Sequence, residues 1–221
     1  MEQRRKPLFF RIMTTARKIA GFLLETQAVK LRPNQPFQWS SGWLSPIYCD
    51  NRITLSHPAA RTFIKKSLAQ AIKRNFPEGT AIVGVATAGI AQGALVADAL
   101  QLPFAYVRPK PKEHGMGNQI EGSIPPGAQV VVIEDLISTG GSSLKCVEAL
   151  RAAGYQVIGM VAIFTYGFST ADANFKAANL PLITLSEYKY LIDEAVKQDY
   201  IPADSVETLK KWRRNPEKWG R

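Results

Sequence analysis

The chain has 221 residues, a length that suits one domain with at most a small accessory part and a sizeable hydrophobic core. Its composition is that of an ordinary globular protein, and no apolar run is long enough to span a membrane. The formal net charge of +10 is spread along the chain and is densest near both ends, so it does not decide between nucleic acid and small anions as partners.

The first third of the chain predicts two helices separated by an aromatic segment. Apolar residues at helical spacing predict a core-facing helix over 10–27 and a second helix over 58–75. Between them, residues 36–52 read PFQWSSGWLSPIYCDNR and predict a short irregular β-hairpin. A packed aromatic turn without a binding role is the alternative interpretation of this segment.

Two buried strands are predicted next, over 81–85 and 104–107. The first turns through a small-residue loop, ATAGI, into a helix that runs to Leu100. Such a strand–glycine–helix junction is a candidate anion site, although the signal is weak on its own.

About twenty residues without a clear hydrophobic period then follow, which is unusual inside a compact domain unless the loop is functional. This segment, 108–127, concentrates Arg108, Lys110, Lys112 and His114 among several glycines. A loop that delivers cations to an anionic leaving group and excludes water would explain it. A solvated basic loop is the alternative.

The most informative stretch covers 129–154. A β-branched run at 130–133 predicts a strand buried on both faces, and Glu134 and Asp135 follow it. A loop rich in hydroxyls and glycine, 138–142, leads into a helix that ends near Gly154. Free backbone N–H groups at such a helix start bind phosphate, whereas carboxylates accept hydrogen bonds from vicinal sugar hydroxyls. The combination suits a ribose 5-phosphate; the alternative is an acidic pair that only caps the helix.

The remaining elements complete an α/β pattern. We predict a strand over 157–164, a helix over 171–178, a strand over 182–185, a helix over 187–198 with Ser186 as its N-cap, and a basic helix over 203–214. Neither a Walker loop nor a dinucleotide fingerprint is present. Alternating strands and helices predict a mainly parallel central sheet flanked by helices, with ligands beyond the carboxyl ends of the strands.

Three of these motifs carry a resemblance to a known family. The run VVVIEDLISTGGS resembles the phosphoribosyl-pyrophosphate (PRPP) signature of type I phosphoribosyltransferases. The pattern F-x-x-x-S-G-x-x-S-P-I-Y-x-D is similar to the hood of orotate phosphoribosyltransferases, and R-x-x-x-K-x-H-G resembles their catalytic loop. The resemblance implies the type I phosphoribosyltransferase fold with a small N-terminal hood. It also implies the conversion of orotate and PRPP, with Mg²⁺, to orotidine 5′-monophosphate (OMP) and pyrophosphate in UMP biosynthesis.

The same resemblance implies the site residues. Lys112, His114 and Asp135 are expected to be catalytic, and Ser138, Tyr48 and Tyr166 to contact orotate, with Ile47 and Cys49 near the ring. The residues expected to bind PRPP are Arg108, Lys112, His114, Glu134, Asp135, Leu136, Ile137, Ser138, Thr139, Gly140, Gly141 and Ser142. No protein metal cage is expected, because Mg²⁺ would be held mainly by PRPP and water.

Some positions depart from the enterobacterial-type pattern of the family. Ser40 and Ala88 stand where that pattern has lysines, Pro109 replaces a second basic residue of the loop, and Tyr166 replaces an arginine that meets orotate. The chain resembles a second branch, and the route by which the orotate carboxylate is bound stays open. Two rivals remain: a phosphoribosyltransferase for another base, and a regulator of the same fold that binds nucleic acid.

The expected organisation has three parts. Residues 1–57 form an N-terminal helix and hood over the base site, 58–170 form the PRPP-binding core with the lid 108–127, and 171–221 complete the domain. We expect a homodimer that shares its lids, with no membrane or nucleic-acid partner. Cys49 and Cys146 lie far apart without metal-type spacing, which fits a reducing, cytoplasmic location.

Overall fold

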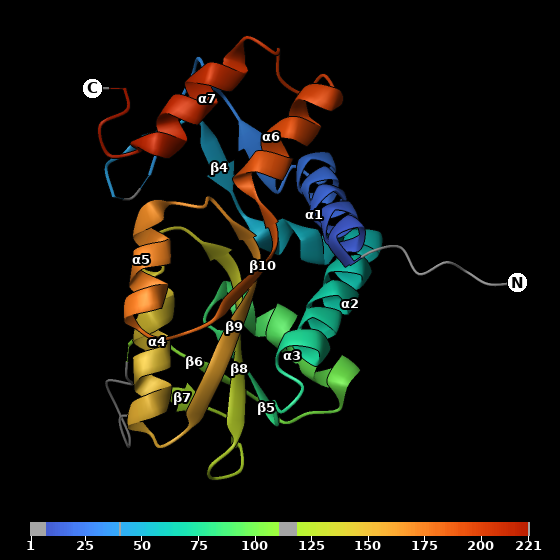
Figure 1. Ribbon diagram of the computed structural model, residues 1–221, viewed down its shortest axis with the longest axis vertical. Helices are drawn as coiled ribbons and strands as arrows, with labels where there is room; N and C mark the ends of the chain where they lie inside the picture. Colours follow the sequence, from blue (N-terminus) through green and yellow to red (C-terminus); the bar gives the residue numbers. More distant parts are fainter. Residues whose placement is uncertain (1–7, 40, 111–118, 221) are drawn as a thin grey trace, which may run out of the picture.

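The computed structural model describes residues 8–39, 41–110 and 119–220 of the chain and is drawn in Figure 1. The helices in those residues are α1 (Leu8–Glu25), the 3₁₀ helix η1 (Asn51–Ser56), α2 (Pro58–Asn75), α3 (Ala88–Leu100), α4 (Gly141–Ala152), α5 (Ser169–Ala177), α6 (Tyr188–Lys197) and α7 (Ser205–Arg214). The strands are β1 (Val29–Leu31), β2 (Phe37–Gln38), β3 (Leu44–Ser45), β4 (Ile47–Cys49), β5 (Ala81–Val85), β6 (Phe104–Val107), β7 (Ile120–Glu121), β8 (Gln129–Ile137), β9 (Gln156–Thr165) and β10 (Leu182–Glu187).

The main sheet confirms the predicted α/β class with a mostly parallel core. Within the described residues its order is β10-β9-β8-β5-β6-β7, with parallel pairs from β10 to β6 and β7 antiparallel to β6. Helices α2 and α3 cover one face of the sheet, and α4 and α5 lie on the other (Figure 1). The carboxyl ends of the parallel strands therefore share one edge, where ligands are expected.

The residues of β8 show why the strand had to be apolar throughout its first half. Val131 and Ile133 pack in the cluster that includes α1, α2 and α3, whereas Val130 and Val132 pack in the cluster that includes α4 and α5. Alternate side chains of a strand point to opposite faces, so a strand covered on both faces needs apolar residues at every position. All four side chains are completely buried.

Several predicted elements have the expected bounds, including α2, β5 and β6. The strand predicted over 130–133 is longer, because β8 continues to Ile137 by pairing with β9 up to Thr165. The acidic pair thus lies within the last part of the strand. The lid segment, predicted as a loop, contains β7, which pairs with the end of β6.

The prediction that Ser186 caps α6 is wrong. The N-cap position is Glu187, without a side-chain cap, and β10 extends through it. The Ser186 side chain is buried and its hydroxyl donates a hydrogen bond to the carbonyl of Ala16 in α1, at 2.8 Å. A serine before a helix signals a cap only when its side chain stays local; here a distant carbonyl competes for it.

The hood consists of β1–β4 and η1 and lies beyond the carboxyl end of the sheet, beside α7 (Figure 1). Its Trp39 ring lies 5.7 Å from the Trp212 ring of α7 in an edge-to-face arrangement. Trp212 is fully buried and also contacts the rings of Tyr166, Phe168 and Tyr188. The last helix therefore provides part of the core on which the hood rests.

Candidate functional site

A hollow of about 690 Å³ lies at the carboxyl ends of β5 and β8, and we call it the central hollow. It is bounded by the turn from β5 into α3, by Pro109 after β6, and by the junction from β8 to α4. The lining residues are Val85, Ala86, Thr87, Ala88, Pro109, Glu134, Asp135, Leu136, Ser138, Thr139, Gly140, Gly141, Ser142, Ser143, Lys145 and Cys146. The fold thus brings the two candidate anion loops of the sequence together in one site.

Close backbone packing sets the distance between these two loops. A Cβ on Gly84 would lie 2.6 Å from the Gly89 carbonyl oxygen, and one on Gly89 would lie 2.5 Å from that of Ile133. Either distance is far shorter than a van der Waals contact, so only glycine lets β5, α3 and β8 approach this closely. The peptide bond between Ala86 and Thr87, on the loop so positioned, is cis.

The acidic pair occupies one wall of the central hollow. Glu134 is buried, and its Oε2 accepts a hydrogen bond from the Ser143 hydroxyl at 2.8 Å while its Oε1 accepts one from the Asp135 amide at 3.0 Å. Burial, and then the charge of Asp135, raise the pKa of Glu134 from 4.5 to about 8; burial raises the pKa of Asp135 as well. The pair therefore keeps a proton near neutral pH until a ligand with donors or a cation stabilises its charge.

We expect the free protein to become less stable as the pH rises towards about 8. The folded Glu134 keeps its proton up to about pH 8, whereas the unfolded side chain releases it near pH 4.5. The contribution of Glu134 to the free energy of unfolding is therefore fully present below pH 4.5 and is lost as the pH rises from 4.5 to about 8. Thermal unfolding followed across this range measures the slope. Glu134→Gln should flatten it, and a variant with an unchanged slope would contradict the assignment.

The loop from Ser138 to Ser142 forms the opposite end of the hollow and leads into α4. Gly140 takes the N-cap position with φ +80°, and α4 has no side-chain cap there. The Thr139 carbonyl accepts a hydrogen bond from the Asn174 side chain of α5 at 3.0 Å, which braces the loop from behind. Uncapped amides at a helix start, held on a braced loop, are suited to bind a phosphate.

Most residues predicted to bind PRPP line the central hollow, and three kinds of exception occur. Ile137 is fully buried in the core and does not line it. Arg108 lies next to Pro109, which lines the hollow, and its Nη1 is 3.6 Å from Glu121 Oε1 of β7. Lys112 and His114 lie outside the described residues.

Three polar residues at or beside this site were not predicted from the sequence. Ser143 contacts Glu134, and Lys145 lines the hollow one turn into α4. Asn51, buried at the start of η1, donates from its side-chain amide to the Asp135 carbonyl at 2.7 Å and so joins the hood to β8. Ser143 and Lys145 could have been predicted only from their position in the first turns of a helix that follows an anion loop, and Asn51 has no such signal.

Tyr48 and Tyr166, both predicted to contact the base, do not line the central hollow. Tyr48 is 42% exposed on β4, where its ring lies 5.7 Å from that of Phe37. Tyr166 is buried among Trp39, Phe164, Phe168 and Trp212. A contact of either ring with a base stays a prediction; the structure instead gives Tyr166 a role in the core beneath the hood.

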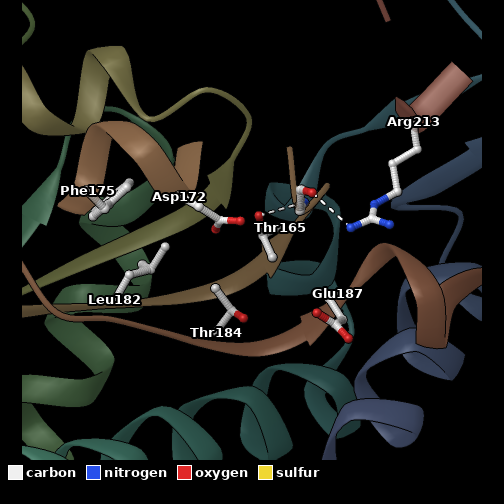
Figure 2. Close-up of a pocket in the computed structure, with 8 residues that line it drawn as sticks. Thr165, Asp172, Phe175, Leu182, Thr184, Glu187 and Arg213 are labelled. Carbon is white, nitrogen blue, oxygen red and sulfur yellow. Dashed lines mark hydrogen bonds between the residues drawn. The ribbon is translucent and has the colours of Figure 1, made fainter. Parts of the chain in front are cut away.

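A second, smaller hollow lies at the ends of β9 and β10, and the acidic pair is not among its lining residues. Figure 2 shows this hollow. Arg213 of α7 points into the loop after β9, where Nη2 donates to the Gly167 carbonyl at 2.9 Å and Nε to the Tyr166 carbonyl at 3.1 Å. The Thr165 hydroxyl accepts from the Gly167 amide at 3.0 Å. These bonds hold the loop that carries Tyr166 from two sides.

No group of three or more histidine, cysteine, aspartate or glutamate side chains in the described part of the chain is arranged to hold a metal ion. Of the helices in residues 8–39, 41–110 and 119–220, none has the length and apolar character needed to cross a membrane.

Comparison with known proteins gives a consistent result. A family model described as the phosphoribosyl transferase domain matches residues 54–198. The chain is 55% identical over 207 residues to orotate phosphoribosyltransferase of Cytophaga hutchinsonii, a match that covers 94% of this chain and 99% of the relative. It is 54% identical over 209 residues to the Listeria monocytogenes enzyme of that name, covering 95% and 100%. The crystal structure of orotate phosphoribosyltransferase from Aeropyrum pernix is similar, with a TM-score of 0.72, 30% identity and coverage of 83% and 99%.

Proposed function

Because this chain belongs to the phosphoribosyl transferase family and, within it, to the orotate phosphoribosyltransferases, we propose that its central hollow joins the 5-phosphoribosyl group of PRPP to orotate. The products are OMP and pyrophosphate, and the reaction belongs to pyrimidine biosynthesis. The observation that supports this most is the union, in one hollow, of an acidic pair and an uncapped helix start. A ribose 5-phosphate needs both, one for its diol and one for its phosphate.

The residues of the hollow then have separate roles. Glu134 and Asp135 accept hydrogen bonds from the ribose hydroxyls, and the amides from Ser138 to Ser142 bind the 5-phosphate. The loop over 86–88 faces the pyrophosphate, and the cations of the lid neutralise the charge that develops as it leaves. The anomeric carbon gains positive charge, so positioning and electrostatics matter more than a strong base.

We also propose Mg²⁺ as the metal of the reaction. An acidic pair at the wall of the hollow fits an ion bound mainly by PRPP oxygens and water. When bound, the ion would neutralise part of the pyrophosphate charge. Glu134 and Asp135 would then accept hydrogen bonds from its water ligands as well as from the ribose. We place the protein in the cytoplasm, since its free cysteines, Cys49 and Cys146, suit a reducing compartment.

A spectrophotometric assay of orotate consumption with PRPP and Mg²⁺ tests the function, with uracil, adenine and hypoxanthine run in parallel. We expect turnover of orotate and little or none of the other bases. Turnover of a different base would agree with the proposed PRPP site and would show that orotate is not the substrate. Absence of all turnover, together with salt-dependent binding to nucleic acid, would instead favour a regulator of the same fold.

Ser143→Ala should weaken PRPP binding without removing the fold. The hydroxyl donates to Glu134 Oε2 at 2.8 Å, and both side chains are buried. The variant therefore removes one hydrogen-bond donor from a buried carboxyl group. A net cost of about 1.4 kcal/mol corresponds to roughly a tenfold rise in KM for PRPP. Ser169→Ala, an exposed serine at the start of α5, is the control. Equal KM values in the two variants would show that Ser143 does not position the pair.

We propose further that the protein is a homodimer in which each lid serves the partner's site. Mixing two inactive variants, Lys112→Ala and Asp135→Asn, tests this. A lid acting across the dimer leaves one site of each mixed dimer intact, so activity returns in part. A lid acting within its own subunit leaves every site with one lesion. No recovery despite demonstrated subunit exchange would rule out the shared lid.

A further inference from the structure

Orotate differs from uracil by a ring carboxylate, and the described residues around the acidic pair are poorly suited to receive an anion. Glu134 and Asp135 line the central hollow, and the negative charge of Asp50 in the hood contributes to the raised pKa of Asp135. Lys145 lines the hollow too, but it extends from α4 beside the phosphate loop. A cation on the hood side is therefore required if the carboxylate is to be recognised.

The start of η1 brings one such cation to this place. Asn51 is hydrogen-bonded to the Asp135 carbonyl at 2.7 Å, which fixes the chain directly before Arg52 against the end of β8. Asp50 caps η1 by accepting from the Arg52 amide at 3.1 Å. The hood turn is thus tied to the acidic strand at one residue and presents a guanidinium at the next.

Asp50 also orients the Arg52 side chain. Its two carboxylate oxygens accept from Nε at 2.7 Å and from Nη2 at 2.8 Å, a two-point contact that fixes the guanidinium plane. The side chain is still 56% exposed, and its hydrogen bonds within the described residues use Nε and Nη2 but not Nη1. One edge of the guanidinium is held in place while the other edge is free for a second carboxylate.

We propose that Arg52 binds the carboxylate of orotate through this free edge and is the residue that selects orotate over uracil. The assignment rests on the proposed function. Arg52 then supplies on the hood side the positive charge that the acidic pair lacks, and Asp50 acts as the positioning residue that keeps the guanidinium in the binding orientation. Asp50 first, then Asp135 and Tyr48, raise the pKa of Arg52, which agrees with its place between hood and acidic pair.

The other described cations of the region fit less well. The Arg32 guanidinium lies 5.0 Å from the centre of the Phe37 ring, on the hairpin side of the hood. Arg108 is paired with Glu121 of β7. Neither belongs to a segment that is hydrogen-bonded to the acidic strand, whereas Arg52 follows such a residue directly.

Binding of OMP and of UMP, which differ only by the carboxylate, isolates the contact. Both affinities are measured by titration calorimetry for the wild-type protein, Arg52→Ala, Arg52→Lys and Arg32→Ala. We expect Arg52→Ala to weaken OMP binding by roughly ten- to a hundredfold, leave UMP binding unchanged and raise KM for orotate in the same proportion. Arg52→Lys should recover only part of the difference, because an ammonium cannot make the same fork. Arg32→Ala should retain the wild-type preference.

Three outcomes overturn the assignment. An unchanged OMP affinity in Arg52→Ala excludes the contact, an equal loss for OMP and UMP shows a structural role, and a loss of the same size in Arg32→Ala shows a general charge effect. The failure of the proposed function is seen separately, because the wild-type protein would then not consume orotate with PRPP at all.

Discussion

Replacing Asp135 with asparagine is expected to lower kcat/KM for PRPP by at least about a hundredfold, equivalent to roughly 3 kcal/mol. Its side chain lines the central hollow, while its amide donates to Glu134 and its carbonyl accepts from Asn51. Asparagine keeps the size of the side chain and both backbone contacts, so the fold should persist. What disappears is the negative charge and one acceptor for the ribose hydroxyls, at the point where the anomeric carbon becomes positive.

Steady-state kinetics with PRPP varied at saturating orotate measure this loss. Glu148→Gln, a change of the same kind on the exposed side of α4, is the control and should behave like the wild-type protein. Circular dichroism of Asp135→Asn verifies the fold. Wild-type kinetics in a folded Asp135→Asn variant would remove the acidic pair from the mechanism.

Gly140→Ala is expected to reduce activity by a hundredfold or so and to destabilise the protein by about 1–3 kcal/mol. Gly140 has φ +80°, a conformation that strains any residue with a Cβ. The added carbon would also lie 2.6 Å from the Phe175 ring of α5. The loop would have to move towards the hollow, which would displace the amides that we assign to the phosphate.

The neighbouring glycine provides a matched control. A Cβ on Gly141 meets only the Thr139 hydroxyl at 3.9 Å, and its φ is not in the left-handed region. Gly141→Ala should therefore keep the melting temperature of the wild-type protein. If both variants unfold at the same temperature, the loop tolerates a side chain at Gly140 and its geometry is not what positions the phosphate.

Local patterns predicted those elements whose physics is local. The helix over 58–75 has a proline at its first position, and the strands over 81–85 and 104–107 are short apolar runs bounded by turns. Two of the ends that were misjudged depend on distant partners. Strand β8 continues past Ile133 because β9 pairs with it, and Ser186 leaves its own helix because the Ala16 carbonyl, far along the chain, accepts its hydroxyl.

In the site, too, features that depend on neighbouring residues could be predicted, and those that depend on distant residues could not. The acidic pair and the glycine loop are adjacent in sequence, so their chemistry could be predicted from residue types and order, and both line the central hollow. Asn51 could not be predicted, because its partner Asp135 lies 84 positions away. Neither could the burial of Tyr166, which depends on Trp212 from a basic helix 46 positions further along the chain.

The packing of Trp212 against Trp39 has a consequence for the order in which the protein is made. The hood precedes α7 in the chain, yet one of the rings that close the core of the hood belongs to α7. The core beneath the hood therefore cannot be completed until α7 has been synthesised. A nascent chain that already contains the loop 138–142 still lacks this core, so removing α7 should loosen the hood before it affects that loop.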